Sequence, residues 1–488
     1  MKRLAAASLC LLLNIYTFGQ TMLGTSLGNY SGINGIQLNP SALLNSKSYI
    51  DIQLLGAVVF LDNNALYISR KDYGFTRFFT PGYRLPSHKE SFGTGDRYLY
   101  LYNTTRSKNA FQNLRITGPG AMLIWKHHGF AISTSLRSVV SLKHIPYEVV
   151  NFSYLGLNYR PQQKINYSDN GPFGGTEMSW GEIGLTYVYT FYANGVNKIS
   201  AGITVKGLFG IGGLYMNVDN IDYTVLNDTT MAVRNLNAQV GIAMPFNYST
   251  NAPNFTKIFK GTGFGTDIGI TYTHISPHHQ FQYFSTACSQ KYENYIYRIG
   301  VALLDIGAIR FSHNTLNMSI DNRDSYWEHL KSFDYKNIRQ FLDTVSIKFY
   351  HNTTSIYSGT SFLIWLPAAL SVQFDYHLNN NWYLNAGFLY GLSLGRQAIV
   401  TPSVISVTPR YESAWFEASL PVSLYDFTWP RVGIAMRFYG FTLGTDNLGG
   451  FFNFNNFTGI DFYFGIKYFI NAGKCRSIEL PLNCVTKN

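Results

Sequence analysis

Alternation of apolar and polar side chains with a period of two is the feature that most constrains this chain. Between Ile199 and Ile211 the odd positions are mostly apolar, whereas the even positions include Ser200, Thr204 and Lys206. A period of two belongs to a β-strand that has one apolar face. No stretch beyond the N-terminus approaches the ~20 consecutive apolar residues that a membrane-spanning helix needs. The pattern therefore predicts a protein built from β-strands.

The N-terminus has the layout of an export signal. Lys2 and Arg3 precede an apolar stretch from Leu4 to Leu13, and Gly19 provides a small residue for cleavage. A positive start, a short apolar core and a small residue form the three parts of a secretory signal, so we expect residues 1–19 to be a signal peptide. An exported chain of alternating strands without a spanning helix predicts a β-barrel in the outer membrane of a Gram-negative bacterium.

Composition favours one large barrel over two or three soluble domains. Charged residues make up only 13% of the chain, about half the usual share of a soluble domain. The chain also holds 36 Phe and 36 Tyr, which suit the aromatic girdles that a barrel has at both membrane interfaces. A soluble β-sandwich is the alternative, but it would need more charge on its surface.

The net charge of +11 reflects a shortage of acidic residues more than an abundance of basic ones. Lys and Arg total 38, Asp and Glu total 27, and the basic residues are dispersed along the chain without a run. This distribution does not indicate a nucleic-acid partner. An attraction to outer-membrane lipid and lipopolysaccharide is the simpler interpretation of a mildly basic exported protein.

The predicted fold class is all-β: a single closed antiparallel transmembrane β-barrel of about 14 strands, within a range of 12–16, with short helices in its loops. The barrel is assigned to residues 47–469 and its last strand to residues 459–469, where aromatic residues alternate with polar ones. Residues 20–46 are polar and rich in Gly and Asn, which predicts a plug inside the lumen or a loose periplasmic arm. Residues 470–488 form a C-terminal tail.

The connections between strands fall into two classes. Short turns face the periplasm in barrels of this kind, and long loops face outward. We therefore expect the long connections 143–177, 276–295 and 314–354 on the outer side, the last of them with a helix. Residues 62–118 are rich in Arg, Lys, Pro, Gly and Asn and are predicted to be mainly a long loop.

The phase of the alternation also predicts which charged residues face the lumen. A charge on the lipid face costs about 2–4 kcal/mol near the membrane midplane, so charged residues within strands are expected inside. Two interpretations remain open: structural ion pairs that hold the plug, or a selectivity lining. Within this set Arg437 and Asp461 are expected to pair if their strands lie close together. The predicted lumen-facing residues are Glu182, Lys206, Asp267, Arg298, Asp375, Arg431, Arg437, Asp461 and Lys467.

The remaining motifs do not indicate an enzyme or a cofactor. Gly24 to Gly28 matches the G-x-S-x-G pattern, but it has no strand before it and no helix after it, as a nucleophile elbow requires. No phosphate-binding, dinucleotide-binding or metal-binding arrangement is present. Cys475 and Cys484 lie in the tail, and the oxidising envelope allows them to form a disulfide or to remain unpaired.

Several motifs together resemble a known group of proteins: Asn34–Ser41, Gly261–Tyr272, Tyr297–Gly307 and Phe441–Asn447. In this order they resemble the Bacteroidota outer-membrane barrels that carry a domain of unknown function. Those barrels are distantly similar to the FadL long-chain fatty-acid transporter and to PorV of the type IX secretion system.

In FadL-like barrels a segment with an Asn-Pro-Ala motif plugs the lumen. Here Asn39-Pro40-Ser41 departs from that motif only at its last residue. The resemblance therefore implies a plug that contains Asn34, Asn39, Pro40 and Ser41.

The resemblance implies a plugged barrel for the uptake or passage of a small, hydrophobic molecule. The alternative is an accessory subunit that transports nothing and belongs to an outer-membrane machine, such as type IX secretion or barrel assembly. Outer-membrane proteins or lipoproteins would then be its partners. An outer-membrane hydrolase is a third class, which the missing catalytic arrangement disfavours.

Overall fold

The computed structural model describes residues 22–72, 80, 82, 84–89, 96–194, 196–254, 257–275, 285–286, 290–291, 295–330, 335–379, 381–452 and 454–470. The predicted signal peptide lies outside the described residues. So do Cys475 and Cys484, together with all of the predicted tail except Ile470. No helix in the described part of the chain is both long and apolar enough to cross a membrane.

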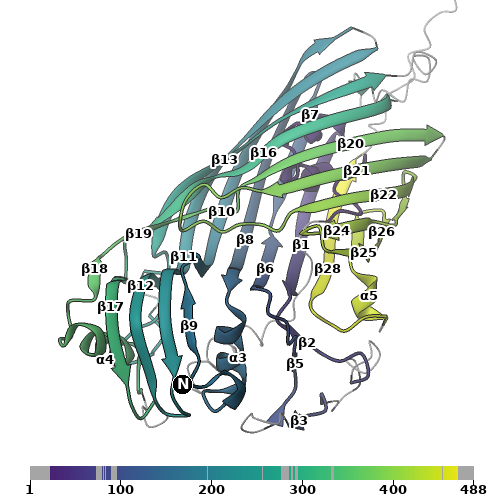
Figure 1. Ribbon diagram of the computed structural model, residues 1–488. Coiled ribbons are helices and arrows are strands. Elements are labelled where there is room, and N and C mark those ends of the chain that lie inside the picture. Colours follow the sequence, from purple (N-terminus) through teal and green to yellow (C-terminus); the bar gives the residue numbers. More distant parts are fainter. Residues whose placement is uncertain are drawn as a thin grey trace, which may run out of the picture.

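The chain forms one closed antiparallel β-barrel of 14 strands (Figure 1), as predicted. Several strands are interrupted, so they consist of two or three segments each. In chain order the strands are β1 (Ile50–Asn63), β6–β7 (Lys108–Thr117 and Gly120–Trp125), β8 (His128–Ile145), β10 (Phe173–Ala193), β11 (Asn197–Val225), β12–β13 (Met231–Ala243 and Gly261–Ile275), β16–β17 (Tyr295–Phe311 and Thr315–Trp327), β18–β20 (Tyr357–Gly359, Phe362–Trp365 and Ala369–Asn379), β21 (Trp382–Gly391), β22 (Val404–Glu412), β23–β24 (Phe416–Ser419 and Val422–Tyr425), β25–β26 (Trp429–Val432 and Ile434–Phe438), β27 (Phe441–Thr445) and β28 (Ile460–Ile470).

The barrel closes between its first and last strands. β28 pairs with β1 from Ile50 opposite Ile470 to Leu61 opposite Ile460. Closure gives every strand a partner on both sides and leaves no unpaired sheet edge. The prediction that residues 459–469 form the last strand is thus correct to within one residue at each end.

The two faces of the wall differ in the way that the alternation predicts. On β10, Leu185 is 61% exposed and points outward, while its neighbour Thr186 is buried inside. On β11, Val205 is 52% exposed and Thr204 is buried. The outward face is therefore apolar and the inward face carries most of the polar groups.

Connections of different length lie at opposite ends of the barrel. Short turns at 126–127, 194–196 and 439–440 define one end, which we call the short-turn end. The other end, which we call the long-loop end, carries α3 (Tyr147–Leu155), α4 (Ile338–Tyr350) and α5 (Leu448–Phe451), all gathered in the lower part of Figure 1. It also carries β9 (Asn166–Asp169) and two small sheets, β2–β5 (Leu66–Tyr67 and Tyr100–Leu101) and β3–β4 (His88–Lys89 and Asp96–Arg97).

Three predicted connections need correction. Most of the segment 276–295 lies outside the described residues, but the strands that flank it end at the short-turn end, because Ile275 pairs with Tyr295 beside Val196. The segment 314–354 is not one loop, because Thr315–Trp327 extends the barrel wall as β17 before α4 begins. Within 62–118, residues 108–117 form the barrel strand β6.

The N-terminal residues fill the barrel interior. We call residues 22–46 the plug segment; it contains two short 3-10 helices, η1 (Gly32–Gln37) and η2 (Pro40–Asn45). Its apolar side chains pack against the inner wall in one cluster: Ile33, Ile36, Leu43, Leu44, Met122, Ile124, Ala131 and Val188.

Wall glycines let the plug segment approach this closely. A Cβ atom at Gly129 would lie 2.2 Å from a methyl group of Leu43, and one at Gly202 would lie 2.8 Å from the backbone nitrogen of Ser41. Neither position has room for a larger side chain unless the plug segment shifts.

Candidate functional site

Asn39 and Ser41 fasten η2 to the wall. The Asn39 side chain caps η2 by accepting from the Ser41 N–H at 2.9 Å. Its Nδ2 donates to Gln373 at 2.9 Å and to the Ile270 carbonyl at 3.3 Å. The Ser41 hydroxyl lies 2.6 Å from the Thr271 hydroxyl on β13. The predicted plug residues Pro40 and Asn34 are also buried inside the barrel, so all four lie within it.

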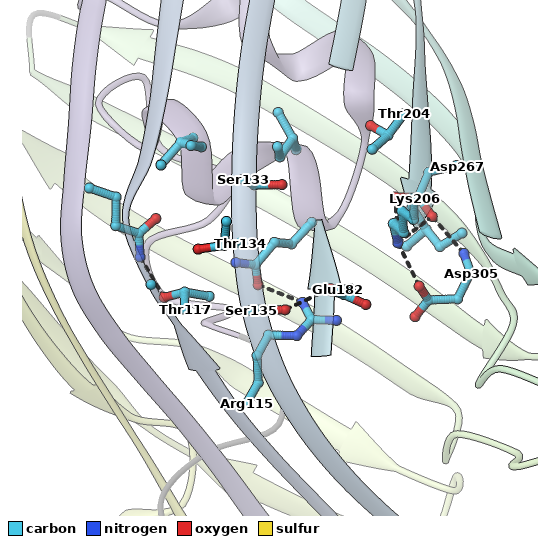
Figure 2. A pocket seen from close by; sticks show the side chains of 17 residues that line it. Arg115, Thr117, Ser133, Thr134, Ser135, Glu182, Thr204, Lys206, Asp267 and Asp305 are labelled. Carbon is cyan, nitrogen blue, oxygen red and sulfur yellow. Dashed lines mark hydrogen bonds and ion pairs between the residues drawn. The ribbon is translucent and has the colours of Figure 1, made fainter. Parts of the chain in front are cut away.

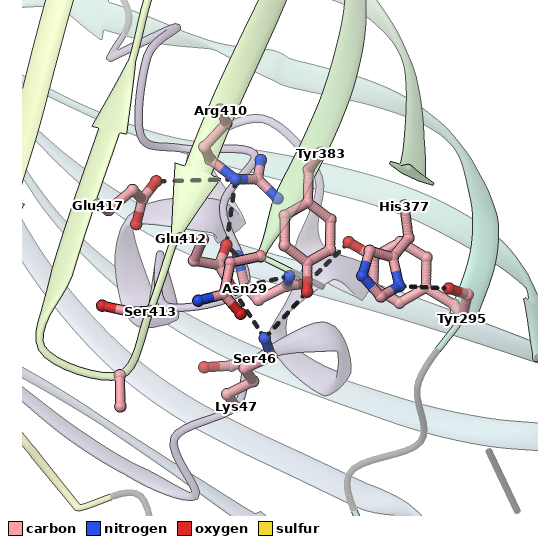
Figure 3. A network of polar contacts seen from close by, with 12 residues as sticks. Asn29, Ser46, Lys47, Tyr295, His377, Tyr383, Arg410, Glu412, Ser413 and Glu417 are labelled. Carbon is pink, nitrogen blue, oxygen red and sulfur yellow. Dashed lines mark hydrogen bonds and ion pairs between the residues drawn. The ribbon is translucent and has the colours of Figure 1, made fainter. Parts of the chain in front are cut away.

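Glu412, at the end of β22, is the centre of a second set of plug contacts (Figure 3). Its carboxylate accepts from the backbone N–H of Asn29 at 3.0 Å and from the Asn29 side chain at 2.9 Å. It also forms ion pairs with Lys47 at 2.9 Å and with Arg410 at 3.1 Å. Glu412 and Arg410 are both buried. One wall carboxylate thus holds both the plug, at Asn29, and the residue that follows the plug, Lys47.

Two predicted lumen residues, Arg298 and Asp375, join the same network. Arg298 donates to Oδ1 of Asn29 at 2.6 Å, and its guanidinium lies 3.6 Å from the centre of the Tyr295 ring. Asp375 accepts from the Tyr295 hydroxyl and from the Asn385 amide, each at 2.6 Å. These groups line the short-turn end of the interior and face the plug.

The C-terminal strands also direct their charged residues inward, but the expected Arg437–Asp461 pair does not form. Arg437 pairs with Glu417 at 3.0 Å, because β26 lies directly against β23 in a register that sets the two residues opposite each other. Asp461 instead accepts from the backbone N–H of Asp446 at 3.3 Å. Lys467 pairs with Asp51 at 2.7 Å.

Lys467 also donates to the carbonyls of Tyr30 and Ser31 in the plug segment. The remaining predicted residue of these strands, Arg431, pairs with Asp62 at 2.7 Å. Every predicted lumen residue on the C-terminal strands therefore has a partner inside the barrel.

A third charged cluster is formed by side chains of β8, β10, β11, β13 and β16 (Figure 2). Lys206 contacts Asp267 at 2.7 Å and Asp305 at 2.6 Å. Arg137 contacts the same Asp305 at 2.9 Å and Glu182 at 3.4 Å. Three predicted lumen residues, Glu182, Lys206 and Asp267, are thus brought together by two residues that the sequence analysis did not single out.

Asp305 reaches this cluster because β16 bulges. Leu304 and Asp305 together oppose Asp267 on β13, and Asp305 has a left-handed backbone with φ of 53°. Its N–H donates to the Asp267 carboxylate at 2.6 Å. A left-handed non-glycine residue is strained and persists only when its surroundings hold it, which the two ion pairs and this bond do here.

Two neighbouring cavities border this cluster. The first, which we call the wall cavity, has a volume of about 50 Å³; its lining includes Gln37, Arg115, Thr134, Glu182 and Asp305. The second, which we call the inner cavity, has a volume of about 60 Å³ and lies between the plug segment and the long-loop half of the interior. The two share part of their lining: Gln37, Arg115, Leu304 and Asp305.

The regular strand pairing is interrupted beside the wall cavity, at a point that we call the wall break; a bond from the Gly118 N–H to the Thr134 carbonyl at 2.9 Å still crosses it. Gly118 and Pro119 separate β6 from β7, and proline has no N–H with which to continue the ladder. Thr134, on the neighbouring strand, shares the outward face with Ile132 and Leu136, which are 47% and 45% exposed. Thr134 nonetheless lines the same cavity as the inward-facing Glu182. The cavity therefore extends from the interior into the break in the wall.

The long-loop half of the interior contains a large apolar cluster beside buried charged groups such as Asp446 and Asp461. Buried side chains from strands all around the barrel form one cluster there, in contact with Leu23 of the plug segment. Most barrels of this size with a water-filled lumen have polar interiors. The largest members of the cluster are Phe60, Phe111, Met178, Trp180, Tyr215, Phe311, Phe362 and Tyr425.

Comparison with known proteins places this arrangement in a family. The family model described as "Family of unknown function (DUF5723)" matches residues 40–446. The chain belongs to this family. The DUF5723 match begins inside the plug segment and ends after β27, so it covers the last part of the plug segment and most of the barrel. No curated protein matches the chain.

The solved structures that the chain matches include two hydrocarbon channels and a FadL homologue. A TodX monoaromatic hydrocarbon channel mutant is 9% identical with a TM-score of 0.41, covering 92% of this chain and 97% of its own. The CymD monoaromatic hydrocarbon channel is 11% identical with a TM-score of 0.30, covering 93% and 96%. A Pseudomonas aeruginosa FadL homologue is 10% identical with a TM-score of 0.24, covering 93% and 99%.

Proposed function

We propose that this DUF5723 protein lies in the outer membrane of a Gram-negative bacterium and allows a small, mainly apolar molecule to pass through its plugged barrel. The outward face supports a membrane location. Leu185, Val205 and Ile268 are each at least 50% exposed on neighbouring strands. A continuous apolar band on the outside of a closed barrel fits the hydrocarbon of a bilayer and would be unfavourable in water.

The apolar cluster in the interior is the main support for an apolar passing molecule. A polar solute would lose its hydration among Phe60, Phe111 and Trp180 without gaining hydrogen bonds, whereas an apolar molecule would gain by burial. Phe111 also lines the inner cavity, so the apolar region leads directly to the plug.

The two cavities then provide a route past the plug. Because they share Gln37 and Arg115, a displacement of η1 would join them. The combined space would run from the apolar interior to the break at Gly118 and Pro119. A molecule that leaves there enters the bilayer sideways instead of crossing the short-turn end, where the plug is most heavily bonded.

Passage requires motion, because cavities of about 50–60 Å³ hold only one or two waters. In this proposal, the arrangement with two separate small cavities is the closed state. Opening must displace plug residues while the barrel itself stays intact.

The test is the entry of an apolar probe into cells that produce the barrel. The outer leaflet of lipopolysaccharide slows N-phenylnaphthylamine, whose fluorescence rises in the bilayer. Cells with the barrel are expected to take it up faster than cells without it. Hydrolysis of nitrocefin, a polar probe, by a periplasmic β-lactamase should stay unchanged. Faster nitrocefin entry alone would indicate a polar pore, and no change in either probe would contradict passage.

A further inference from the structure

We propose that a groove on the outward face of the barrel binds an anionic phospholipid of the periplasmic leaflet. The acyl chains lie in the groove, and the phosphate lies at the turn that contains Lys126 and His127. This inference goes beyond the passage of a molecule and rests only on the membrane location in the proposed function. The groove crosses β1, β7, β8, β10 and β11, each of which pairs with the next.

The shape of the wall produces the groove. Its volume is about 800 Å³, more than ten times that of either internal cavity. The floor lies at Ala121, whose small side chain is opposite Ile52 on β1 and Ile132 on β8. Larger outward side chains border it on several strands: Leu123, Phe130, Leu185 and Val205. A long, narrow apolar body fits such a groove.

The lining accepts hydrocarbon but does not choose among lipids. Of its 13 residues only Thr186 and Tyr187 have a polar side-chain atom, and Thr186 is buried. An acyl chain gains van der Waals contacts there, but a bilayer is equally apolar everywhere, so apolar burial adds no preference. Preference for one lipid must therefore come from the groups that meet its head group.

Aromatic side chains mark the level of the head groups. Trp125 and His128 lie opposite each other, one outward position beyond the groove residues Leu123 and Phe130. The His128 ring lies 5.0 Å from the ring of Tyr189 on β10. Trp and Tyr concentrate where hydrocarbon meets water, because their rings are apolar and their tips polar. The groove therefore ends at the membrane interface of the short-turn end, which faces the periplasm in barrels of this kind.

The turn beyond these aromatic residues carries positive charge without an acidic neighbour. Lys126 and His127 are exposed in the turn between β7 and β8. The Nζ atom of Lys126 lies 5.6 Å from the centre of the Trp125 ring. Neither residues 121–134 nor residues 183–197, which form the neighbouring hairpin end, contain Asp or Glu.

This charge distribution decides which head group fits. A phosphate accepts hydrogen bonds from the Lys126 ammonium and from the His127 ring. The ammonium of a zwitterionic head group would instead meet another cation and no carboxylate on these two hairpin ends. The site therefore favours phosphatidylglycerol over phosphatidylethanolamine.

A lipid in this groove would lie across a short joint of the wall. β7 pairs with β1 over four residue pairs, from Ile50 opposite Leu123 to Gln53 opposite Gly120. Ile50, Ile52 and Leu123 all line the groove, so an acyl chain contacts both strands of this joint. A ligand that binds the folded barrel stabilises it, so the bound lipid supports closure at this point.

The test is native mass spectrometry of the purified full-length protein in detergent. It receives equal amounts of phosphatidylglycerol and phosphatidylethanolamine with identical acyl chains. Phosphatidylglycerol is expected to be retained about fivefold more often, the preference that one lysine near a lipid surface provides. Lys126→Gln should remove that preference. Lys71→Gln, which alters an exposed lysine at the long-loop end, is the matched control and should keep it.

Ala121→Phe tests the groove itself, because a ring at this position fills its floor. It should reduce retention of both lipids. Ala386→Phe is the matched control and should not, because it enlarges an outward alanine on β21, between Phe374 and Val407 and away from the groove.

Three results would overturn the inference. These are equal retention of the two lipids by the unaltered protein, an unchanged preference in Lys126→Gln, or unchanged retention in Ala121→Phe. A dimer that Ala121→Phe dissociates would also overturn it, because a second copy would then occupy the groove. If the two lipids are retained equally while N-phenylnaphthylamine still enters cells, the proposed passage stands and only the lipid site fails. If the preference depends on Lys126 while the probe does not enter, the lipid site stands and passage fails.

Discussion

The Nζ atom of Lys47 lies 2.9 Å from Oε1 of Glu412, so the chain just after the plug segment is ion-paired to strand β22. The same carboxylate holds Asn29, near the other end of the plug. Asn29 and Lys47, which are also joined by a bond from the Lys47 N–H to the Asn29 carbonyl at 2.7 Å, therefore depend on one wall residue. A plug held in this way can move as a unit only after the bonds to Glu412 are broken.

Glu412→Gln should loosen the plug. Removal of one partner from a buried ion pair typically costs about 3–5 kcal/mol, because the other charges are left uncompensated. Here Arg410 and Lys47 both lose an ion pair, and Arg410 keeps its longer contacts to Asp375 at 3.5 Å and to Glu417 at 4.0 Å. We expect a lower midpoint in heat-modifiability gels and faster protease cleavage within residues 22–46.

Asp222→Asn is the control for that substitution. Asp222 pairs with Arg234 at the long-loop end, where both side chains are partly exposed, and such pairs contribute less than about 1 kcal/mol. If Glu412→Gln is no more damaging than Asp222→Asn, Glu412 does not hold the plug.

Gly118→Phe should block the proposed exit. A Cβ atom at Gly118 would lie 2.8 Å from the Thr134 hydroxyl, so a ring there occupies the break in the wall. Entry of N-phenylnaphthylamine should fall toward the rate of cells without the barrel. Gly181→Phe is the matched control, because a Cβ atom at Gly181 has nothing within 4 Å. An unchanged rate in Gly118→Phe, with normal folding, would show that the molecule does not leave there.

Arg437 and Glu417 should behave as a coupled pair. Reversal of either charge leaves two like charges buried side by side and should lower the heat-modifiability midpoint strongly. Exchange of the two residues should recover part of the loss, since contacting residues couple by about 0.5–3 kcal/mol. By contrast, the losses in midpoint from charge reversal at Arg437 and at Asp461 should simply add in the double variant. Additive losses for Arg437 and Glu417 would contradict the observed contact.

Glu148 lies in α3 at the long-loop end, outside the barrel wall, and should make the stability of that helix depend on pH. Burial in α3 raises the pKa of its carboxyl above the ordinary value. A folded state with a raised acid pKa is most stable below the unfolded pKa and loses that stability as the pH rises through the folded pKa. Glu148→Gln should therefore slow hydrogen exchange of α3 relative to the unaltered protein at pH 8. The two proteins should exchange alike at pH 4, and equal exchange at both pH values would count against a buried carboxyl.

Alternation alone was sufficient to predict the barrel and much of its lining. The closing strand was placed to within one residue because Ile460 to Tyr468 alternate without interruption. The same rule placed Lys206 and Asp267 inside, where they pair. The rule also predicts that Arg137 points inward, because the adjacent Leu136 points outward, although Arg137 was not singled out.

The rule failed where the backbone departs from a regular strand. Ile299, Val301 and Leu303 point outward, so strict alternation would turn Asp305 outward as well; the bulge in β16 brings it inside. Arg115 was missed because the polar composition of residues 62–118 suggested a loop and concealed β6. The pairing of Arg437 was wrong because strand order cannot be read from the alternation of single strands.

The most direct test of the central claim is a disulfide that locks the plug to the wall. Ser41→Cys and Thr271→Cys, in a chain with its other mature cysteines replaced by serine, put two thiols where hydroxyls now lie 2.6 Å apart. Thr190→Cys with Ser200→Cys, whose hydroxyls lie 2.8 Å apart on β10 and β11, locks two wall strands and serves as the control. Oxidation of the first pair should stop the barrel-dependent entry of N-phenylnaphthylamine, reduction should restore it, and the control pair should have no effect. Undiminished entry through the oxidised Ser41–Thr271 lock would contradict plug-gated passage.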